Sequence, residues 1–163
     1  MSKRFFTPQT SEQHLGETFS SGWFLMDQRR ITAFGGITED FDPHHIDPAF
    51  AAKHSVHGKT IAFGFLTLSM LTAMLYEVLH YALDGDASEG WPVNFGFREL
   101  RFVAPVLVDS RIRGHFTVKE VSERKPGQKL FVLDCTVEIE GQTKPAMIAL
   151  WECVWVSAEG RHE

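Results

Sequence analysis

Carboxylate and imidazole side chains are concentrated in one short stretch of this 163-residue chain. The stretch contains Asp40, Asp42, His44, His45 and Asp47. In a loop, a carboxylate and an imidazole at the spacing of Asp40 and His45 can converge on one point. Such a pair suits general acid–base catalysis, because its members can take and give protons near neutral pH.

Two prolines set the backbone of this stretch. Pro43 and Pro48 restrain the residues before them to extended geometry, which predicts a loop rather than the middle of a helix. Taken alone, Asp40 and His45 could equally be ordinary loop residues that cap a helix over residues 48–54. We expect no metal site here, because the spacing fits no known set of metal ligands and Pro43 prevents a single shared face.

A long apolar segment follows the polar stretch. Residues 65–83 contain no Pro or Gly, and apolar side chains recur at helical spacing on nearly every face, which predicts a buried or membrane helix. The segment also carries Thr67, Ser69, Thr72, Glu77 and His80. These polar residues argue against a membrane span of about 20 apolar residues. We therefore expect a helix of about 19 residues, roughly 28 Å long, buried inside a soluble domain.

The second half of the chain alternates between apolar and polar residues. After residue 84 this period predicts strands over residues 93–102, 112–118 and 131–139, and the run 145–156, which is apolar on both faces, predicts a central strand. Gly114 falls inside the second of these runs and predicts a bend there. Four strands after one buried helix indicate an α+β fold, in which an antiparallel β-sheet wraps around one long central helix.

The first half of the chain predicts shorter elements. We expect a short strand over residues 18–25 and a helix over residues 28–34, capped by Asp27 and ended by Gly35-Gly36. One or two helical turns should cover residues 48–54, and residues 55–60 should form a loop. The whole chain, residues 1–163, should be one domain with a partly ordered N-terminal arm over residues 1–17.

Composition excludes several classes of function. The hydrophobic fraction of 44% excludes disorder, and a net charge of −5 without a basic block argues against nucleic acid as a partner. Cys135 and Cys153 lie inside apolar runs, which is typical of buried free thiols. The N-terminal residues lack the apolar region of a secretory signal, so the expected compartment is the cytoplasm, with no membrane partner.

Several motifs, in order along the chain, resemble those of one enzyme family. ITEDFDPHHIDPAFA resembles the signature G-D-x-N-P-x-H of the MaoC-like (R)-specific enoyl-CoA hydratases, matching at Asp40, Pro43 and His45. GKTIAFGFLTLSML is similar to the start of their central helix, and FRELRFVAPVLVDSRIRG to one of their strands. VEIEGQTKPAMIALWE is similar to the branch that includes nodulation protein N.

This resemblance implies a fold, a reaction and a set of residue roles. It implies a hotdog fold, a homodimer, no cofactor, and substrates that are thioesters of CoA or of acyl carrier protein. Asp40 and His45 match the catalytic pair, which holds the water that adds reversibly, on one face, to a trans-2-enoyl thioester. Gly64 matches the oxyanion-hole glycine, and a glycine at the start of a buried helix suits that role because free N–H groups favour a developing negative oxygen.

The chain departs from the family pattern at three positions. Glu39, Asp42 and Phe63 stand where the family usually has Gly, Asn and His. Two neighbouring carboxylates, Asp40 and Asp42, should raise each other's proton affinity if both point into the site. Phe63 removes a polar group from the pocket rim, and we expect it to line the entrance for the acyl or pantetheine chain.

Three further side chains are candidates for contact with substrate: Phe65, Thr72 and Asn94. Thr72 falls where the family often has a Ser near the catalytic Asp, but it could instead bond its own helix backbone. Asn94 lies among aromatic strand residues, where packing at the strand end is an equal alternative.

Two other functions remain open from the sequence. A hotdog acyl-CoA thioesterase would need an acid close to Gly64 on the central helix, and Glu77 lies more than three turns beyond that glycine. A noncatalytic acyl-thioester binding protein would retain the fold while the three departures silence the catalytic pair.

Overall fold

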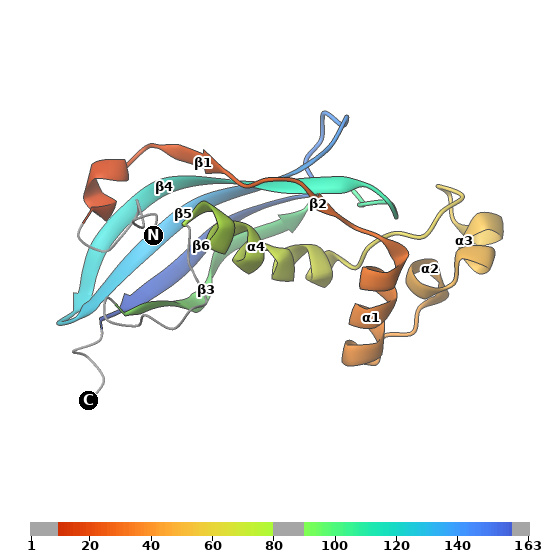
Figure 1. Ribbon diagram of the computed structural model, residues 1–163, viewed down its shortest axis with the longest axis horizontal. Helices are drawn as coiled ribbons and strands as arrows, with labels where there is room; N and C mark the ends of the chain where they lie inside the picture. The colour runs from red at the N-terminus through yellow and green to blue at the C-terminus, as the bar shows by residue number, and fades with distance from the viewer. Residues whose placement is uncertain (1–9, 80–89, 158–163) are drawn as a thin grey trace.

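The computed structural model describes residues 10–79 and 90–157, and it places a group of helices beside a curved sheet (Figure 1). In chain order the elements are η1 (Ser11–His14), β1 (Thr18–Ser20), β2 (Phe24–Leu25), α1 (Gln28–Thr38), α2 (Pro43–Ile46), α3 (Pro48–His54), α4 (Gly64–Val78), β3 (Trp91–Phe102), β4 (Arg111–Lys125), β5 (Gln128–Ile139) and β6 (Met147–Val156). The predicted α+β class is confirmed.

The sheet is antiparallel, and its long strands are the four that the sequence predicts. Their order is β1-β4-β5-β6-β3, and β2 also pairs with β4. The strand predicted over residues 18–25 is in fact two short strands, which both pair with β4. Alternate residues of β4 and β5 face the core, so each of these strands has one buried face and one more exposed face.

Helix α4 lies along the concave side of the sheet and supplies one wall of the core (Figure 1). Its buried side chains recur every three or four positions: Leu66, Thr67, Met70, Leu71, Met74, Leu75 and Val78. Burial of each large apolar side chain contributes about 1.5–3 kcal/mol. The helix is shorter than predicted, since it ends at Val78 with Leu79 as its C-cap, and residues 80–83 of the predicted helix lie outside the described residues.

The pairing of β4 with β5 runs through Gly114 without a shift in register. A Cβ atom at this position would lie 2.8 Å from the Phe116 ring and 3.1 Å from Met74 Sδ. The missing side chain therefore lets α4 approach the sheet closely. The irregularities of β4 lie further along the strand, between Val118 and Glu120 and between Glu123 and Lys125.

Helix α1 is capped by the Asp27 side chain, as predicted, but it runs beyond Gly35-Gly36 to Thr38. Glu39 ends it in the left-handed conformation, with φ 58°. Gly35 lies inside the helix. A side chain would not fit at this position, because a Cβ atom there would lie 2.8 Å from the Asp40 carbonyl oxygen and 3.1 Å from the Phe63 ring. Close packing, rather than helix termination, explains this glycine.

The stretch around Pro43 is also more regular than predicted. Residues Pro43–Ile46 form the one-turn helix α2, with Pro43 in its first turn and Asp42 as its N-cap. Proline is favoured at the first position of a helix because its missing N–H would have no partner there. The predicted helical turns over residues 48–54 are confirmed as α3, capped by Asp47.

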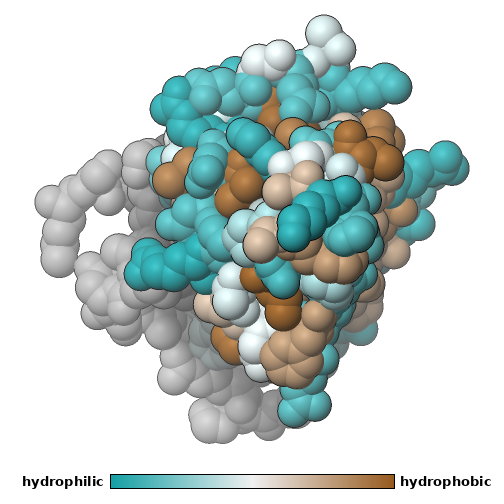
Figure 2. Space-filling model, turned by 90° about the vertical axis from the view of Figure 1, so that its right-hand side faces the viewer, coloured by the Kyte–Doolittle hydropathy of each residue, from teal (hydrophilic) through white to brown (hydrophobic). Residues whose placement is uncertain are grey.

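Helices α1, α2 and α3 project beyond one end of the sheet, where α4 begins (Figure 1). Figure 2 looks onto this end of the molecule and shows apolar side chains at the surface among hydrophilic ones. Ile37 and Phe41, which lie on either side of Asp40 in the sequence, are 83% and 62% exposed. No helix within the described part of the chain has the length and apolar character that crossing a bilayer requires.

Candidate active site

Asp40 follows the C-cap of α1, at the point where the chain turns back. Its amide N–H donates to the Gly35 carbonyl at 3.1 Å, which fixes the turn. Its carboxylate is exposed and accepts a hydrogen bond from the Asp42 amide at 3.2 Å. The side chain is therefore oriented by its own loop but remains accessible to water or substrate.

The Asp42 side chain caps the N-terminus of α2 rather than acting with Asp40 as a second carboxylate in the site. Its Oδ1 accepts hydrogen bonds from the His44 amide at 2.9 Å and from His44 Nδ1 at 2.8 Å. The backbone hydrogen bond from His44, followed by the ring, holds the pKa of Asp42 below its ordinary value. The pKa of Asp42 is thus lowered rather than raised, because the hydrogen bonds from His44 stabilise its charged form.

His45 lies in α2 with its ring held on two sides. Nδ1 lies 2.7 Å from the Ile61 carbonyl oxygen. Because a carbonyl can only accept, Nδ1 carries the hydrogen and donates it. In the neutral ring Nε2 then keeps its lone pair free to take a proton. The Phe63 ring packs against the imidazole, with centroids 3.9 Å apart and planes inclined by 32°.

Phe63 is buried, with only 4% of its surface exposed, and it also packs against Phe34. In the single chain it therefore supports His45 rather than lining an open entrance. Its ring also lies beside the position that a Gly35 Cβ would occupy, which is in turn close to the Asp40 main chain. Phe63 thus contacts the ring of His45 and lies near the turn that carries Asp40.

Gly64 is the first residue of α4, so the helix N-terminus lies one residue beyond Phe63. The first N–H groups of a helix have no intrahelical acceptor, and they carry the positive end of the helix dipole. A Cβ at Gly64 would lie 3.2 Å from the Phe102 ring, so this aromatic ring closes one side of the helix start. Chemically, the arrangement offers hydrogen-bond donors for an oxygen that becomes negative.

The other predicted substrate contacts lie at different distances from this centre. Phe65 is 66% exposed and packs edge-on against Phe102, with ring centroids 5.9 Å apart. Thr72 is half-buried and lies two turns along α4, about 12 Å from Gly64. Asn94 is exposed and lies eight positions along β3 from Phe102, about 27 Å away, so one chain does not bring it to Gly64.

Two contributors to the site were not predicted from the sequence. The Ile61 carbonyl selects the His45 tautomer, but a main-chain atom leaves no mark in the residue pattern. Phe102 covers Gly64 only because β3 returns to the start of α4. Its own side chain is 47% exposed.

No three His, Cys, Asp or Glu side chains lie close enough together to hold a metal ion in residues 10–79 and 90–157. An apolar cavity lies at the other end of α4, lined by residues that include Leu75, Val78, Phe116 and Trp155. Leu75 is eleven residues from Gly64, about 16 Å along the helix. Among the described residues that line it there is no carboxylate or imidazole, and it lies apart from the site.

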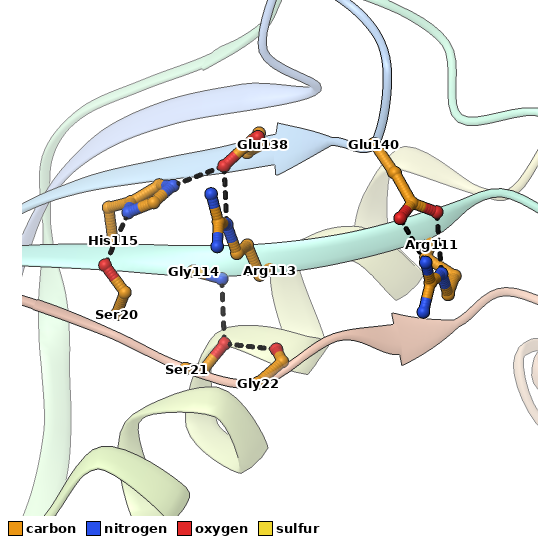
Figure 3. Close-up of polar contacts among 9 residues, drawn as sticks. All are labelled: Ser20, Ser21, Gly22, Arg111, Arg113, Gly114, His115, Glu138 and Glu140. Atoms are coloured by element: carbon orange, nitrogen blue, oxygen red, sulfur yellow. Dashed lines mark hydrogen bonds and ion pairs between the residues drawn. The ribbon is translucent and has the colours of Figure 1, made fainter.

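A second polar cluster lies on the sheet, across β1, β4 and β5 (Figure 3). His115 Nδ1 lies 2.7 Å from Ser20 Oγ, and its Nε2 lies 2.7 Å from Glu138 Oε2. Arg113 Nε donates to the same Glu138 oxygen at 2.6 Å and, with His115, holds the pKa of Glu138 below its ordinary value. The cluster ties the short β1 to the long strands, which is a structural role.

Comparison with known proteins places the chain in a family. Residues 10–139 match the family model described as a MaoC like domain. Nodulation protein N of Rhizobium leguminosarum bv. viciae is 36% identical over 144 residues, 88% of this chain and 85% of that protein. The 3-hydroxyacyl-thioester dehydratase Z of Mycobacterium tuberculosis is 34% identical over 129 residues, 79% of this chain and 82% of that protein.

A solved structure shows the same architecture. The X-ray structure of a monoamine oxidase regulatory protein from Archaeoglobus fulgidus superposes with a TM-score of 0.71 at 26% identity, covering 88% of this chain and 90% of that one. The likeness confirms the hotdog fold, with its antiparallel sheet around one helix.

Proposed function

Since the chain belongs to the family of MaoC-like domains, in the branch of nodulation protein N, we propose that it is an (R)-specific enoyl-CoA hydratase. Run in reverse, the same reaction makes it a 3-hydroxyacyl-thioester dehydratase. The substrates are trans-2-enoyl thioesters of CoA or of acyl carrier protein, and no cofactor takes part. The observation that carries the proposal is the hydrogen bond from His45 Nδ1 to the Ile61 carbonyl, at 2.7 Å, which leaves Nε2 free as a base.

The reaction uses one water molecule held between Asp40 and His45. His45 Nε2 takes a proton from the water as its oxygen forms a bond to Cβ of the enoyl thioester. The electrons of the double bond move towards the thioester carbonyl, whose oxygen becomes negative and accepts a hydrogen bond from the Gly64 N–H. The protonated Nε2 then returns its proton to Cα on the same face, while the Asp40 carboxylate orients the water and stabilises the imidazolium.

We also propose that the active protein is a homodimer. Within the described strands, β3 forms an edge of the sheet, because it pairs only with β6. Its exposed apolar side chains include Val93, Phe95 and Phe97. An edge strand with a row of exposed apolar residues needs covering, and pairing with a second copy of the chain would cover it.

A steady-state assay with crotonyl-CoA tests the proposed reaction. We expect the enoyl absorbance to fall and (R)-3-hydroxybutyryl-CoA to form. Release of a free thiol instead would support the thioesterase, and tight binding without turnover would support the noncatalytic binding protein. His45→Gln should abolish most of the activity, and His44→Gln is the matched control, because His44 is the adjacent imidazole and its ring hydrogen-bonds the helix cap Asp42.

A further inference from the structure

We infer that Gln28 is a positioning residue, which fixes the position of His45 relative to the segment that leads into α4. Gln28 is the first residue of α1 and lies 17 positions before His45 in the chain. The inference rests on the proposed role of His45, and it concerns a side chain that would itself touch neither water nor substrate.

The amide of Gln28 bridges two separate segments. Its Nε2 donates to the His45 carbonyl oxygen at 2.8 Å, and its Oε1 accepts from Thr60 Oγ1 at 2.5 Å. The orientation of the amide is fixed by these partners, because the His45 carbonyl can only accept and needs the nitrogen. The second hydrogen on Nε2 donates to Thr32 Oγ1 at 3.1 Å. All of the amide hydrogens are therefore used.

Both ends of this bridge lie beside the bond that fixes the His45 ring. Thr60 is 1% exposed, and it precedes Ile61, whose carbonyl accepts from His45 Nδ1. The Ile61 amide donates back to the His44 carbonyl at 3.2 Å. Gln28 thus fixes the main chain of His45 relative to the residue that selects its tautomer.

The segment from Thr60 to Ala62 is itself anchored to the loop before β4. Ala62 N–H donates to the Val106 carbonyl at 2.7 Å, and Val108 N–H donates to the Thr60 carbonyl at 3.0 Å. Helix α2 is a single turn and cannot satisfy its own last carbonyls, so the His45 carbonyl depends on an outside donor. Gln28 supplies that donor from α1.

Removal of the Gln28 amide should therefore loosen His45 without removing any reacting group. In Gln28→Met, which keeps the length of the side chain, we expect His45 to leave the Ile61 carbonyl part of the time. We expect kcat for crotonyl-CoA to fall roughly 10- to 100-fold, with KM changed less than threefold, because misplacement of a catalytic group affects the transition state most. Gln28→Glu keeps the acceptor for Thr60 but loses the donor, so it should resemble Gln28→Met.

The matched control is Thr32→Val. It removes the third partner of the same amide, on the exposed side of α1, and leaves the bridge to His45 intact. We expect kcat within twofold of the wild-type value. Thr60→Ser, which keeps the buried hydroxyl, should also retain activity, whereas Thr60→Val should share part of the loss.

The deciding measurement is nitrogen-15 NMR of the imidazole rings, with His45 assigned by the resonances that vanish in His45→Gln. We expect the Nδ1–H tautomer in the wild-type protein and in Thr32→Val, and a mixture with the Nε2–H tautomer in both Gln28 variants. An unchanged tautomer and unchanged kcat in the two variants would overturn the inference. A tautomer shift in a protein that proves inactive towards enoyl thioesters would leave the positioning role standing and reject the proposed function instead.

Discussion

Asp40 and His45 are held with very different firmness, although both belong to one proposed pair. The His45 ring is fixed by the Ile61 carbonyl and by the face of Phe63. The exposed carboxylate of Asp40 accepts a hydrogen bond from the Asp42 amide, so its own loop alone orients it. We therefore assign the proton transfers to the fixed imidazole and the orientation of water to the freer carboxylate.

This division of roles gives the first prediction. Asp40→Asn and His45→Gln should each lower kcat by roughly 10²–10⁴, the usual contribution of a positioned acid or base. The double variant should be little worse than the worse single variant, because the two groups act as a unit on one water. Steady-state kinetics with crotonyl-CoA measures all three. Losses in kcat that multiply in the double variant would show independent roles. Full activity in Asp40→Asn would refute the proposed mechanism.

Phe63 gives the second prediction, because its burial contradicts a position at an open entrance. Phe63→Ala should lower the free energy of unfolding by about 3–5 kcal/mol, as for other buried aromatic residues. It should lower kcat for short and long enoyl thioesters alike, since the lost contact is with His45. Phe65→Ala, at a neighbouring position that is 66% exposed rather than 4%, is the control and should change stability little. A loss that depends on chain length would restore the entrance role.

At the residue scale, the sequence could predict the reacting groups but not their supports. Asp40, His45 and Gly64 were found because a motif records residue type and spacing. Ile61 contributes only its main chain, and Gln28 acts from a helix end where it looked like an ordinary first-turn residue. Such contacts depend on which segments meet in the fold, and a single sequence does not record that.

At the scale of elements, the predicted helices and strands exist but several of their ends are displaced. The spacing of apolar residues predicted the type of α4 and of the four long strands. The reason is plain for α4, β4 and β5, which each bury one face, whereas no residue of β3 is fully buried. The glycine pair in α1 and the proline in α2 were misjudged. Both residue types usually end or interrupt helices, and here Gly35 is required by packing while Pro43 occupies the one helical position that favours it.

The two adjacent glycines of α1 give the third prediction. A Cβ at Gly36 would meet nothing within 4 Å, whereas one at Gly35 would lie 2.8 Å from the Asp40 carbonyl oxygen. Gly36→Ala should therefore stabilise the protein by about 0.5–1 kcal/mol, through the better helix propensity of alanine. Gly35→Ala should destabilise it and displace Asp40, with a loss of activity. Urea unfolding of the two variants side by side is the measurement, and equal effects would refute the packing role of Gly35.

At the scale of the whole molecule, the β3 edge of the sheet is the reason to expect a homodimer. The fourth prediction is a homodimer that persists at micromolar concentration, because pairing across β3 would bury Val93, Phe95 and Phe97. Light scattering during gel filtration measures the mass directly. Phe95→Glu should favour the monomer, and Val56→Glu, at an apolar residue that is 95% exposed in the loop before α4, is the control. A wild-type monomer at that concentration would contradict the hypothesis.

The fifth prediction concerns pH and the cluster that ties β1 to the sheet. Arg113, and then His115, lower the pKa of Glu138 in the folded state, so this carboxylate stabilises the fold above its unfolded-state pKa. The contribution is lost as the pH falls through the lower folded-state value. Glu138→Gln should therefore be less stable than the wild-type protein at pH 7, and the gap should close in strong acid.

Urea unfolding between pH 7 and pH 3 measures that gap. Arg113→Met should make the stability change less with pH, because it removes the largest cause of the lowered pKa of Glu138. A gap that stays constant over the whole range would mean that Glu138 contributes through packing rather than through its charge.

The two thiols of the sheet have a practical consequence for redox behaviour. Burial raises the pKa of Cys153 to about 12 and raises that of Cys135 as well, and the side chains are 4% and 0% exposed. Because the thiolate is the reactive form, neither residue should react readily with oxidants or alkylating agents while the sheet is closed. Modification of either cysteine would therefore mark molecules whose strands have separated. The rate of cysteine modification would then report how often the core opens.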